Sequence, residues 1–312
     1  GGIRMQKKQT IAEAEVEKEK LNVDMYALND RVNDLYFGIL LLDEQIKQNT
    51  LLQDELERNY RQITAYVENG IANQADLDAV KVEQLNTKQK RIDLVSSRAA
   101  YLKMLSLLVG EALSPETVLE KPVPQSTVSA VSEIRRPELA LFDAQGAGLQ
   151  VQEKALNVRH LPQFGLFVQG AYGNPGLDML KNEFSPYYMA GVRLSWNFGS
   201  LYTLKNDRRV IEKKRQQLDN NRDIFLFNTR LEMTQQDQAI HSLEKQMRDD
   251  DEIIRLRTNI RKAAEAKVAN GTLTVTEMLR ELTNESLARQ SKAMHEIQRL
   301  MGIYQLKYTT NY

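Results

Sequence analysis

The sequence contains no cysteine, which excludes disulfide scaffolds, thiolate metal sites and cysteine nucleophiles. Histidine is nearly as scarce, since the 312 residues include only His160, His241 and His295. These three lie far apart, and none has a ligand-like spacing such as H-x-x-x-H. The sequence therefore predicts neither a histidine metal site nor a catalytic triad. We expect no metal, no cofactor and no catalytic residues.

Glycine, proline and net charge are also low. The 15 glycines and 7 prolines disfavour a turn-rich all-β protein and low-complexity disorder. Basic and acidic residues both number 42, so the formal net charge is zero, whereas a nucleic-acid-binding protein would show a basic excess. No apolar run approaches the ~18 residues that a transmembrane helix needs. No G-x-S-x-G, P-loop or H-E-x-x-H spacing supports an enzyme.

The sequence does contain long stretches in which apolar residues recur with the period of a helix. Residues 5–67 include no proline, and Gly38 is their only glycine. The apolar residues of this range step by four and three, as in the seam of a coiled coil. They are Leu28, Val32, Leu35, Ile39, Leu42 and Ile46. Later seam positions admit polar residues such as Asn49. We expect a helix of ~60 residues that ends at Asn69-Gly70, because both residues tolerate positive φ.

Further helices follow the same logic. We expect them at about 75–109 with a stop at Gly110, at 137–158, from 201 to Asn270-Gly271, and at 275–306. Residues 111–135 hold three prolines and are expected to be irregular. The acidic run 249–252 falls on a helix and is expected to face water, with a divalent-ion site as the alternative.

Residues 163–198 alternate with a period of two and predict strands at 163–173 and 187–198. One parity is mainly apolar: Phe164, Leu166, Val168 and Tyr172, then Tyr188, Ala190, Val192, Leu194, Trp196 and Phe198. The opposite parity of the second strand carries Gly191, Arg193, Ser195 and Asn197. A loop begins at Asn174-Pro175-Gly176. The pattern is typical of transmembrane β-barrel strands, but a hairpin that packs its apolar face on the helices would show it too.

The chain contains an internal repeat. Asn69-Gly70 and Asn270-Gly271 each end a long helix, and Gln89 and Gln290 share their offset of 201. An acid and an apolar residue follow each turn, Asp76-Leu77 and Glu277-Met278. The repeated unit is a long helix, an Asn-Gly turn and a return helix. Two strands ending at Gly199 precede the second copy, whereas the sequence begins at Gly1-Gly2. We therefore expect the natural protein to have a further strand pair before the first copy.

Five short pieces carry a resemblance to a known family. In chain order they are Asn69-Gly70-Ile71 leading to Asp76-Leu77, Arg136-Pro137-Glu138-Leu139, Leu161-Pro162-Gln163, Leu194-Ser195-Trp196-Asn197-Phe198-Gly199, and Asn270-Gly271-Thr272 with Glu277. Together they make the chain resemble the TolC-like outer-membrane efflux proteins over essentially its whole length. Each motif alone is weak, and the order and the duplication carry the resemblance.

The resemblance implies a mainly α fold. Two repeats of long antiparallel coiled-coil hairpins would form an α-barrel, with a short transmembrane-type β-hairpin. Residues 1–112 would be the first hairpin, 113–160 an equatorial linker and helix, 161–200 the β-barrel strand pair, and 201–312 the second hairpin. The protein would be a homotrimeric exit duct of a tripartite efflux or type I secretion system. It would be placed in the outer membrane with its helices in the periplasm.

The resemblance also implies partners and site residues. A periplasmic adaptor protein would meet the helical tip directly, an inner-membrane pump would act indirectly, outer-membrane lipid would surround the strands, and no nucleic acid would bind. The docking tip would comprise Asn69, Gly70, Ile71, Asn270, Gly271, Thr272 and Leu273. We expect both glycines to be left-handed, with Ile71 and Leu273 exposed; the alternative is that the glycines only cap helices. Leu194, Trp196 and Phe198 would face lipid, and Arg193 and Asn197 the lumen.

One part of the family pattern is changed. Where well-studied members carry an acid in an electronegative constriction ring, the chain has Arg280. Leu273 stands at the position of a linking arginine, although Asp76 keeps the acid. The candidates for a pore constriction are therefore Asp76, Glu277 and Arg280. The alternative is that these are solvated charges at helix ends.

A different class of function is a soluble periplasmic coiled-coil adaptor or scaffold. Such an adaptor also has a long helical hairpin, but usually a single one between β-rich domains. The doubled hairpin and the amphipathic strands favour the exit duct.

Overall fold

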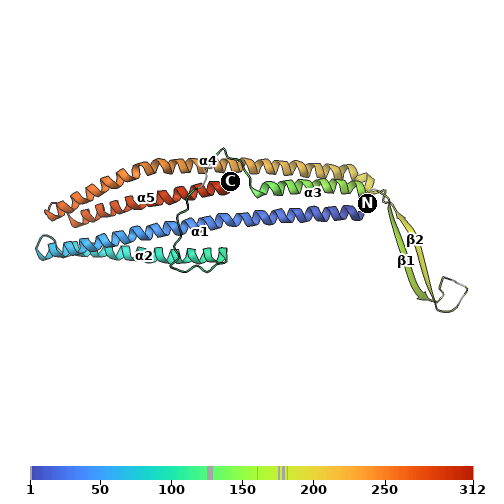
Figure 1. Ribbon diagram of the computed structural model, residues 1–312, viewed down its shortest axis with the longest axis horizontal. Coiled ribbons are helices and arrows are strands. Elements are labelled where there is room, and N and C mark those ends of the chain that lie inside the picture. Colours follow the sequence, from blue (N-terminus) through green and yellow to red (C-terminus); the bar gives the residue numbers. More distant parts are fainter. Residues whose placement is uncertain are drawn as a thin grey trace. The chain divides into compact units, whose positions relative to one another are not determined.

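The computed structural model describes residues 2–124, 129–159, 161–174, 176–177, 180 and 182–311. Gly1, His160 and Pro175 lie outside the described residues. In chain order the elements are α1 (Gly2–Glu68), α2 (Gln74–Val109), α3 (Pro137–Arg159), β1 (Gln163–Gly173), β2 (Ser185–Ser195), α4 (Ser200–Ala269) and α5 (Val275–Thr310) (Figure 1). The predicted mainly α fold with two helical hairpins and a short β-hairpin is confirmed.

The two hairpins are nearly equal in size. The long helices α1 and α4 have 67 and 70 residues, and the return helices α2 and α5 have 36 each. As predicted, α2 stops at Gly110, which has the left-handed conformation, with φ +73°. The equal lengths support the internal repeat.

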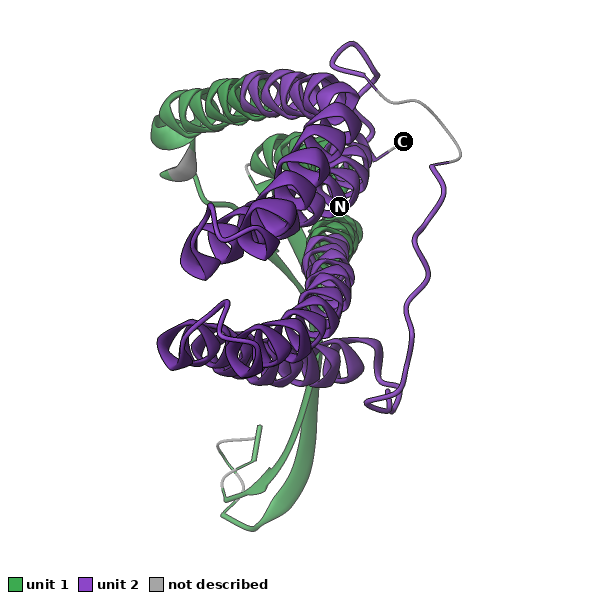
Figure 2. Cartoon of the chain, turned by 90° about the vertical axis from the view of Figure 1, so that its left-hand side faces the viewer, with its two compact units in different colours: residues 1–23, 137–225 green, residues 24–136, 226–312 purple. Residues whose placement is uncertain are grey.

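The chain forms two compact units (Figure 2). Unit 1 contains residues 1–23 and 137–225, and unit 2 contains residues 24–136 and 226–312. Both long helices therefore contribute to both units. Among the described residues, none of the helices is long and apolar enough to cross a membrane.

In unit 2, α1 packs on two partners through two neighbouring faces. Leu35 and Ile39 of the predicted seam form a buried cluster with α2 residues Leu102 and Leu105. A second face forms a cluster with α5, in which the buried members are Phe37, Leu40 and Ile297. The apolar run that begins at Phe37 is thus explained by burial on two sides rather than by a membrane span.

The acidic run on α4 is only partly solvated, and the expectation that it faces water is wrong for one residue. Asp250 is buried, and its carboxylate lies 2.9 Å from Nδ1 of His295 on α5. Asp251 pairs with Lys292, which lies on α5 one turn before His295. The carboxylates therefore serve packing between α4 and α5, and no group of three potential metal ligands occurs among the described residues.

Unit 1 buries little apolar surface. Ile211 is its only buried large apolar residue among those described. Helix α3 packs on α4 through the rings of Phe142 and Phe225, whose centroids are 5.9 Å apart, and through an Arg222–Asp143 ion pair of 2.6 Å. Large apolar side chains such as Ile3 stay exposed in this unit.

The strands β1 and β2 form an antiparallel pair whose register runs from Gln163 opposite Ser195 to Gly173 opposite Ser185. The second strand was predicted to continue to residue 198, and this end is wrong. Gln163 is the first residue of β1, and Pro162 before it has no N–H to donate to a ladder. Beyond Ser195 the second strand therefore lacks a partner.

Candidate functional site

The two Asn-Gly turns of unit 2 have the same backbone conformation. Gly70 has φ +70° and Gly271 has φ +69°. Gly70 N–H donates to the carbonyl of Val67, and Ile71 N–H donates to that of Tyr66, with N···O distances of 3.1 and 2.8 Å. This pair of bonds is the Schellman motif, which satisfies carbonyls at the end of a helix. The predicted left-handed glycines are confirmed.

The second turn repeats the Schellman pair of the first. Gly271 N–H donates to the carbonyl of Val268 at 2.9 Å, and Thr272 N–H donates to that of Lys267 at 2.9 Å. The amides of Asn69 and Asn270 each donate to the carbonyl four residues earlier, at 2.7 and 2.8 Å. The asparagines therefore close the helix end, which explains why the dipeptide and not the glycine alone is repeated.

The acids that follow the turns belong to capping boxes. Asn73 and Thr274 are the N-caps of α2 and α5, and their side chains accept hydrogen bonds from the N–H groups of Asp76 and Glu277. In return the carboxylates of Asp76 and Glu277 accept from the backbone N–H of their N-cap, at 3.0 and 3.1 Å. This backbone hydrogen bond is the main reason that the pKa of Glu277 lies below its ordinary value.

Sequence reasoning noticed both acids but missed this role. The signal was present as N-x-x-D and T-x-x-E immediately before an apolar-periodic helix, which is the pattern of a capping box. Helix capping therefore accounts for the presence of an acid at this position in both halves of the chain.

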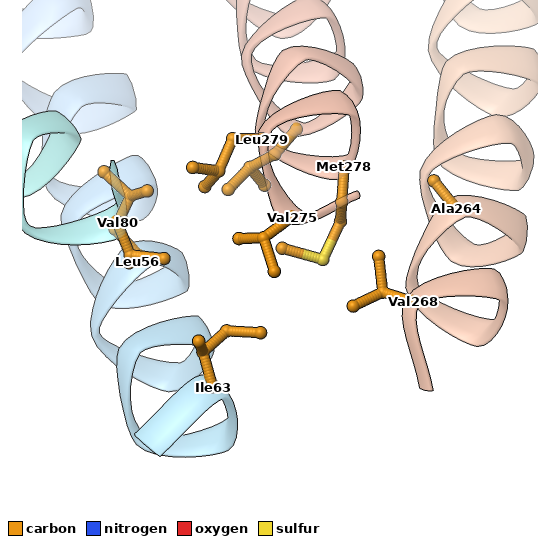
Figure 3. Close-up of a cluster of buried hydrophobic side chains, with 9 residues drawn as sticks. Leu56, Ile63, Val80, Ala264, Val268, Val275, Met278 and Leu279 are labelled. Carbon is orange, nitrogen blue, oxygen red and sulfur yellow. The ribbon is translucent and has the colours of Figure 1, made fainter. Parts of the chain in front are cut away.

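Ala72 and Leu273 of the two turns pack against the same buried cluster, which places both turns at the same end of unit 2, as predicted. Figure 3 shows the cluster. The cluster draws on all four helices: Leu56, Ile63, Val80, Ala264, Val268, Val275, Met278, Leu279 and Leu282. Because α1, α2, α4 and α5 all contribute, the cluster joins the two hairpins. The tip, defined as residues 69–73 and 270–274, therefore has a packed base.

The two turns differ in what they expose. Ile71 is 51% exposed, as predicted. The prediction for Leu273 is wrong, because Leu273 is partly buried and packs on the cluster. The repeat offset explains the difference, since Leu273 corresponds to Ala72, which packs there too, whereas Ile71 corresponds to Thr272.

Arg280 lies on the first turns of α5, and its side chain is 69% exposed. Among the described residues its guanidinium forms one ion pair, in which Nε lies 3.4 Å from the carboxylate of the neighbouring Glu281. The guanidinium is therefore free to meet a group outside the chain, whereas Asp76 and Glu277 are held by their caps.

Behind the tip, a charged network ties the hairpins together. Arg261 of α4 lies 3.1 Å from Glu55 of α1 and also contacts Glu285 of α5. Arg289 donates to the other oxygen of Glu285 at 2.6 Å, and Thr258 donates to that oxygen at 2.8 Å. Burial raises the pKa of Glu285, but these hydrogen bonds outweigh it and hold the pKa below its ordinary value.

In unit 1, the register of the strand pair places its apolar residues on one face. Phe164 lies opposite Leu194, Leu166 opposite Val192, and Tyr172 opposite Pro186. Residues directly opposite each other in an antiparallel pair point to the same side. Leu166 and Val192 are 86% and 66% exposed, so this face is uncovered within the chain. It is not packed on the helices.

Trp196 and Phe198 follow the end of β2. Their ring centroids are 4.4 Å apart, and both side chains are exposed. They extend the apolar surface of Leu194 past the last paired residue. Their expected contact with lipid remains a prediction.

Neither a family model nor a curated protein matches the sequence. Solved structures do match. VceC, an outer-membrane protein of Vibrio cholerae, is 12% identical with a TM-score of 0.79, and the match covers 99% of this chain and 76% of that one. CmeC, an outer-membrane channel of Campylobacter jejuni, is 11% identical with a TM-score of 0.76, covering 99% and 68%. MtrE, an outer-membrane channel of Neisseria gonorrhoeae solved in its open state, is 12% identical with a TM-score of 0.74, covering 99% and 72%.

These similarities extend over nearly the whole chain and show its fold. The chain has the fold of the outer-membrane channels, as its resemblance to the TolC-like family predicted.

Proposed function

We propose that the protein is an exit duct of the outer membrane, which passes cargo from the periplasm to the outside without chemical change. The observation that carries this proposal is the strand pair, in which one face is mainly apolar and exposed to solvent while the other face is largely polar or small. Lipid on one side and water on the other would each meet a suitable surface. The fold shared with outer-membrane channels over 99% of the chain supports the same assignment.

The functional division that we propose follows the chain. Residues 161–200 would enter the outer membrane, and the hairpins 1–112 and 201–312 with the linker 113–160 would stand in the periplasm. Type I secretion and tripartite efflux both need such a duct. The apolar strand face would be unnecessary in a soluble periplasmic adaptor, which the structure gives no reason to prefer.

We further propose that the duct is a homotrimer. Unit 1 leaves large apolar side chains exposed on its helices, including Ile3, Ile11 and Val210. Two strands also have unpaired outer edges, which are unsafe unless other strands cover them. Neighbouring copies of the chain would cover both surfaces, and closed rotational symmetry is the usual arrangement of such assemblies.

At the tip we propose contact with a periplasmic adaptor through Asn69, Gly70, Ile71, Asn270, Gly271, Thr272 and Leu273. Exposed Ile71 supplies an apolar anchor, and the open space around both glycines admits a close backbone approach. An inner-membrane pump would then act through the adaptor. For the pore constriction, Arg280 is the candidate whose charge is available, beside the capping acids Asp76 and Glu277.

The test is whether the protein inserts into the outer membrane and restores export. The full-length protein is expressed in a Gram-negative strain that lacks its own exit duct, and membranes are separated and washed with carbonate. We expect a carbonate-resistant trimer in the outer-membrane fraction and lower dye accumulation when a compatible pump and adaptor are present. A protein found only in the soluble periplasmic fraction would overturn the proposal in favour of the adaptor class.

A further inference from the structure

The face of the strand pair opposite the apolar one carries a single charge. Its residues are Gln163, Gly165, Phe167, Gln169, Ala171 and Gly173, paired with Ser195, Arg193, Gly191, Met189, Tyr187 and Ser185. Arg193 is the only ionisable group of either sign among them except the phenol of Tyr187. All residues of both strands are described, so no acid of the strands balances this cation.

The surroundings of Arg193 keep its charge available. The residue directly opposite is Gly165, which has no side chain to cover it. The guanidinium lies over the ring of Phe167, 5.5 Å from its centroid, and among the described residues it forms no ion pair. An aromatic face attracts a cation without neutralising it and leaves the N–H groups free for other acceptors.

Phe167 is itself held in place by a glycine. Gly191 lies opposite Phe167, and a Cβ added at Gly191 would stand 2.9 Å from two carbons of the ring. The ring therefore lies over bare backbone, and Arg193, two residues along the same face, lies over the ring. These three residues fix the position of the cation on the polar face of the strand pair.

We propose that Arg193 makes the membrane-spanning part of the duct selective for anionic solutes. The inference rests on the proposed function, because the polar face borders water only if the apolar face borders lipid. In an assembly of several copies, the arginines form a ring of positive charge around the lumen. Rings of arginine or lysine favour anions in pores, because the walls focus their field on the passing ion.

The experiment uses the absence of cysteine from these 312 residues, in which a single introduced thiol is the only one. Arg193→Cys protein and wild type are reconstituted in planar bilayers with a KCl gradient, and the reversal potential gives the chloride-to-potassium permeability ratio. We expect Arg193→Cys and Arg193→Gln to lower this ratio about twofold or more. An ethylammonium methanethiosulfonate should then restore the ratio in the cysteine variant, and the ethylsulfonate analogue should lower it further.

Val192→Cys is the matched control, one residue earlier on the apolar face opposite Leu166. Because charged reagents do not reach a lipid-facing thiol, they should leave its conductance and selectivity unchanged. If the Arg193 variants conduct with the same permeability ratio as wild type, the anion selectivity is overturned and the proposed exit duct is not affected. Modification at Val192 but not at residue 193 would overturn the assignment of the faces. Absence of any wild-type conductance would instead overturn the proposed function, and the selectivity with it.

Discussion

Gly70 and Gly271 have the same left-handed conformation, and each is followed by the same hydrogen bonds and the same capping box. The similarity extends through the asparagine before each glycine and the acid six residues after it. The Schellman pair and the capping box are kept in both turns, whereas Ile71 in the first turn is replaced by Thr272 in the second. The fold therefore requires the hydrogen bonds, and the side chain after the glycine is available for a partner to distinguish the turns.

The turn glycines provide the first prediction. Gly70→Ala and Gly271→Ala should each lower the free energy of unfolding by about 1–2 kcal/mol, because a Cβ disfavours the left-handed region even where space is open. Denaturant unfolding followed by circular dichroism measures this. Gly148→Ala on α3 is the control; nothing lies near its Cβ position and its φ is not in the left-handed range, so it should stabilise the helix by about 0.5–1 kcal/mol.

Replacing the same glycines with tryptophan tests the docking role. Alanine and tryptophan impose similar backbone strain, but only tryptophan fills the space in front of the turn. If an adaptor docks there, Gly70→Trp should abolish export by an intact trimer, whereas Gly70→Ala should retain it. Equal export by both variants would leave the glycines with the capping role alone.

The sequence predicted those features that neighbouring residues specify, such as helix ends and the alternation of the strands. Gly110, Asn69-Gly70 and Asn270-Gly271 terminate their helices because glycine tolerates positive φ, so these three helix ends were predicted to within about two residues. The end of α5 lacks such a signal, and the helix continues to Thr310 instead of stopping at about residue 306. The strand pairing also followed from alternation, because a period of two fixes which residues share a face. The end of β2 was wrong because it depends on where the partner strand begins.

The contacts between the hairpins could not be read from the sequence. The coiled-coil seam identified one partner of α1, but Phe37 and Leu40 form a second face whose partner, α5, is more than 200 residues away. The pairing of Arg261 with Glu55 likewise requires two helices to be adjacent in space. Charged residues are frequent on every helix, and periodicity alone does not say which of them meet.

The network behind the tip predicts acid sensitivity. The folded-state pKa of Glu285 is lowered, so its contribution to stability is present above the unfolded pKa and is lost as pH falls through the folded value. The free energy of unfolding should therefore decrease from about pH 5 downward. In Glu285→Gln this decrease should be smaller, and stability at pH 7 should be lower, because Arg261 and Arg289 each lose a partner.

Glu212→Gln is the control for the acid titration, since Glu212 is exposed on α4. It should change neither the stability at pH 7 nor the slope below pH 5. Unfolding titrations at several pH values compare the three proteins. Parallel curves for wild type and Glu285→Gln would show that Glu285 does not contribute to the acid sensitivity.

A close helix contact predicts a reversal of the usual effect of glycine replacement. Alanine normally stabilises a helix interior by about 0.5–1 kcal/mol relative to glycine. At Gly38 of α1, however, a Cβ would lie 2.6 Å from Cε2 of Tyr101 on α2. Gly38→Ala should therefore lower stability in the wild-type background and raise it in a Tyr101→Ala background. A double-mutant cycle measures the difference, and a coupling near zero would contradict the contact.

The assignment of the strand faces predicts opposite outcomes for the same charge on neighbouring surfaces. Leu194 lies opposite Phe164 on the apolar face, and Gln169 lies opposite Met189 on the polar one. Leu194→Arg should destabilise membrane assembly by about 1 kcal/mol, because lipid cannot solvate the guanidinium; the cost is smaller than at the bilayer midplane, since Leu194 lies one pair from the end of the strand pair. Gln169→Arg places the same group in the lumen, where water solvates it, and should assemble as wild type does. Heat-resistant trimers in the outer-membrane fraction, quantified by gel electrophoresis, measure assembly for both. Normal assembly of Leu194→Arg would show that the apolar face does not meet lipid, and failure of Gln169→Arg alone would show that the two faces are exchanged.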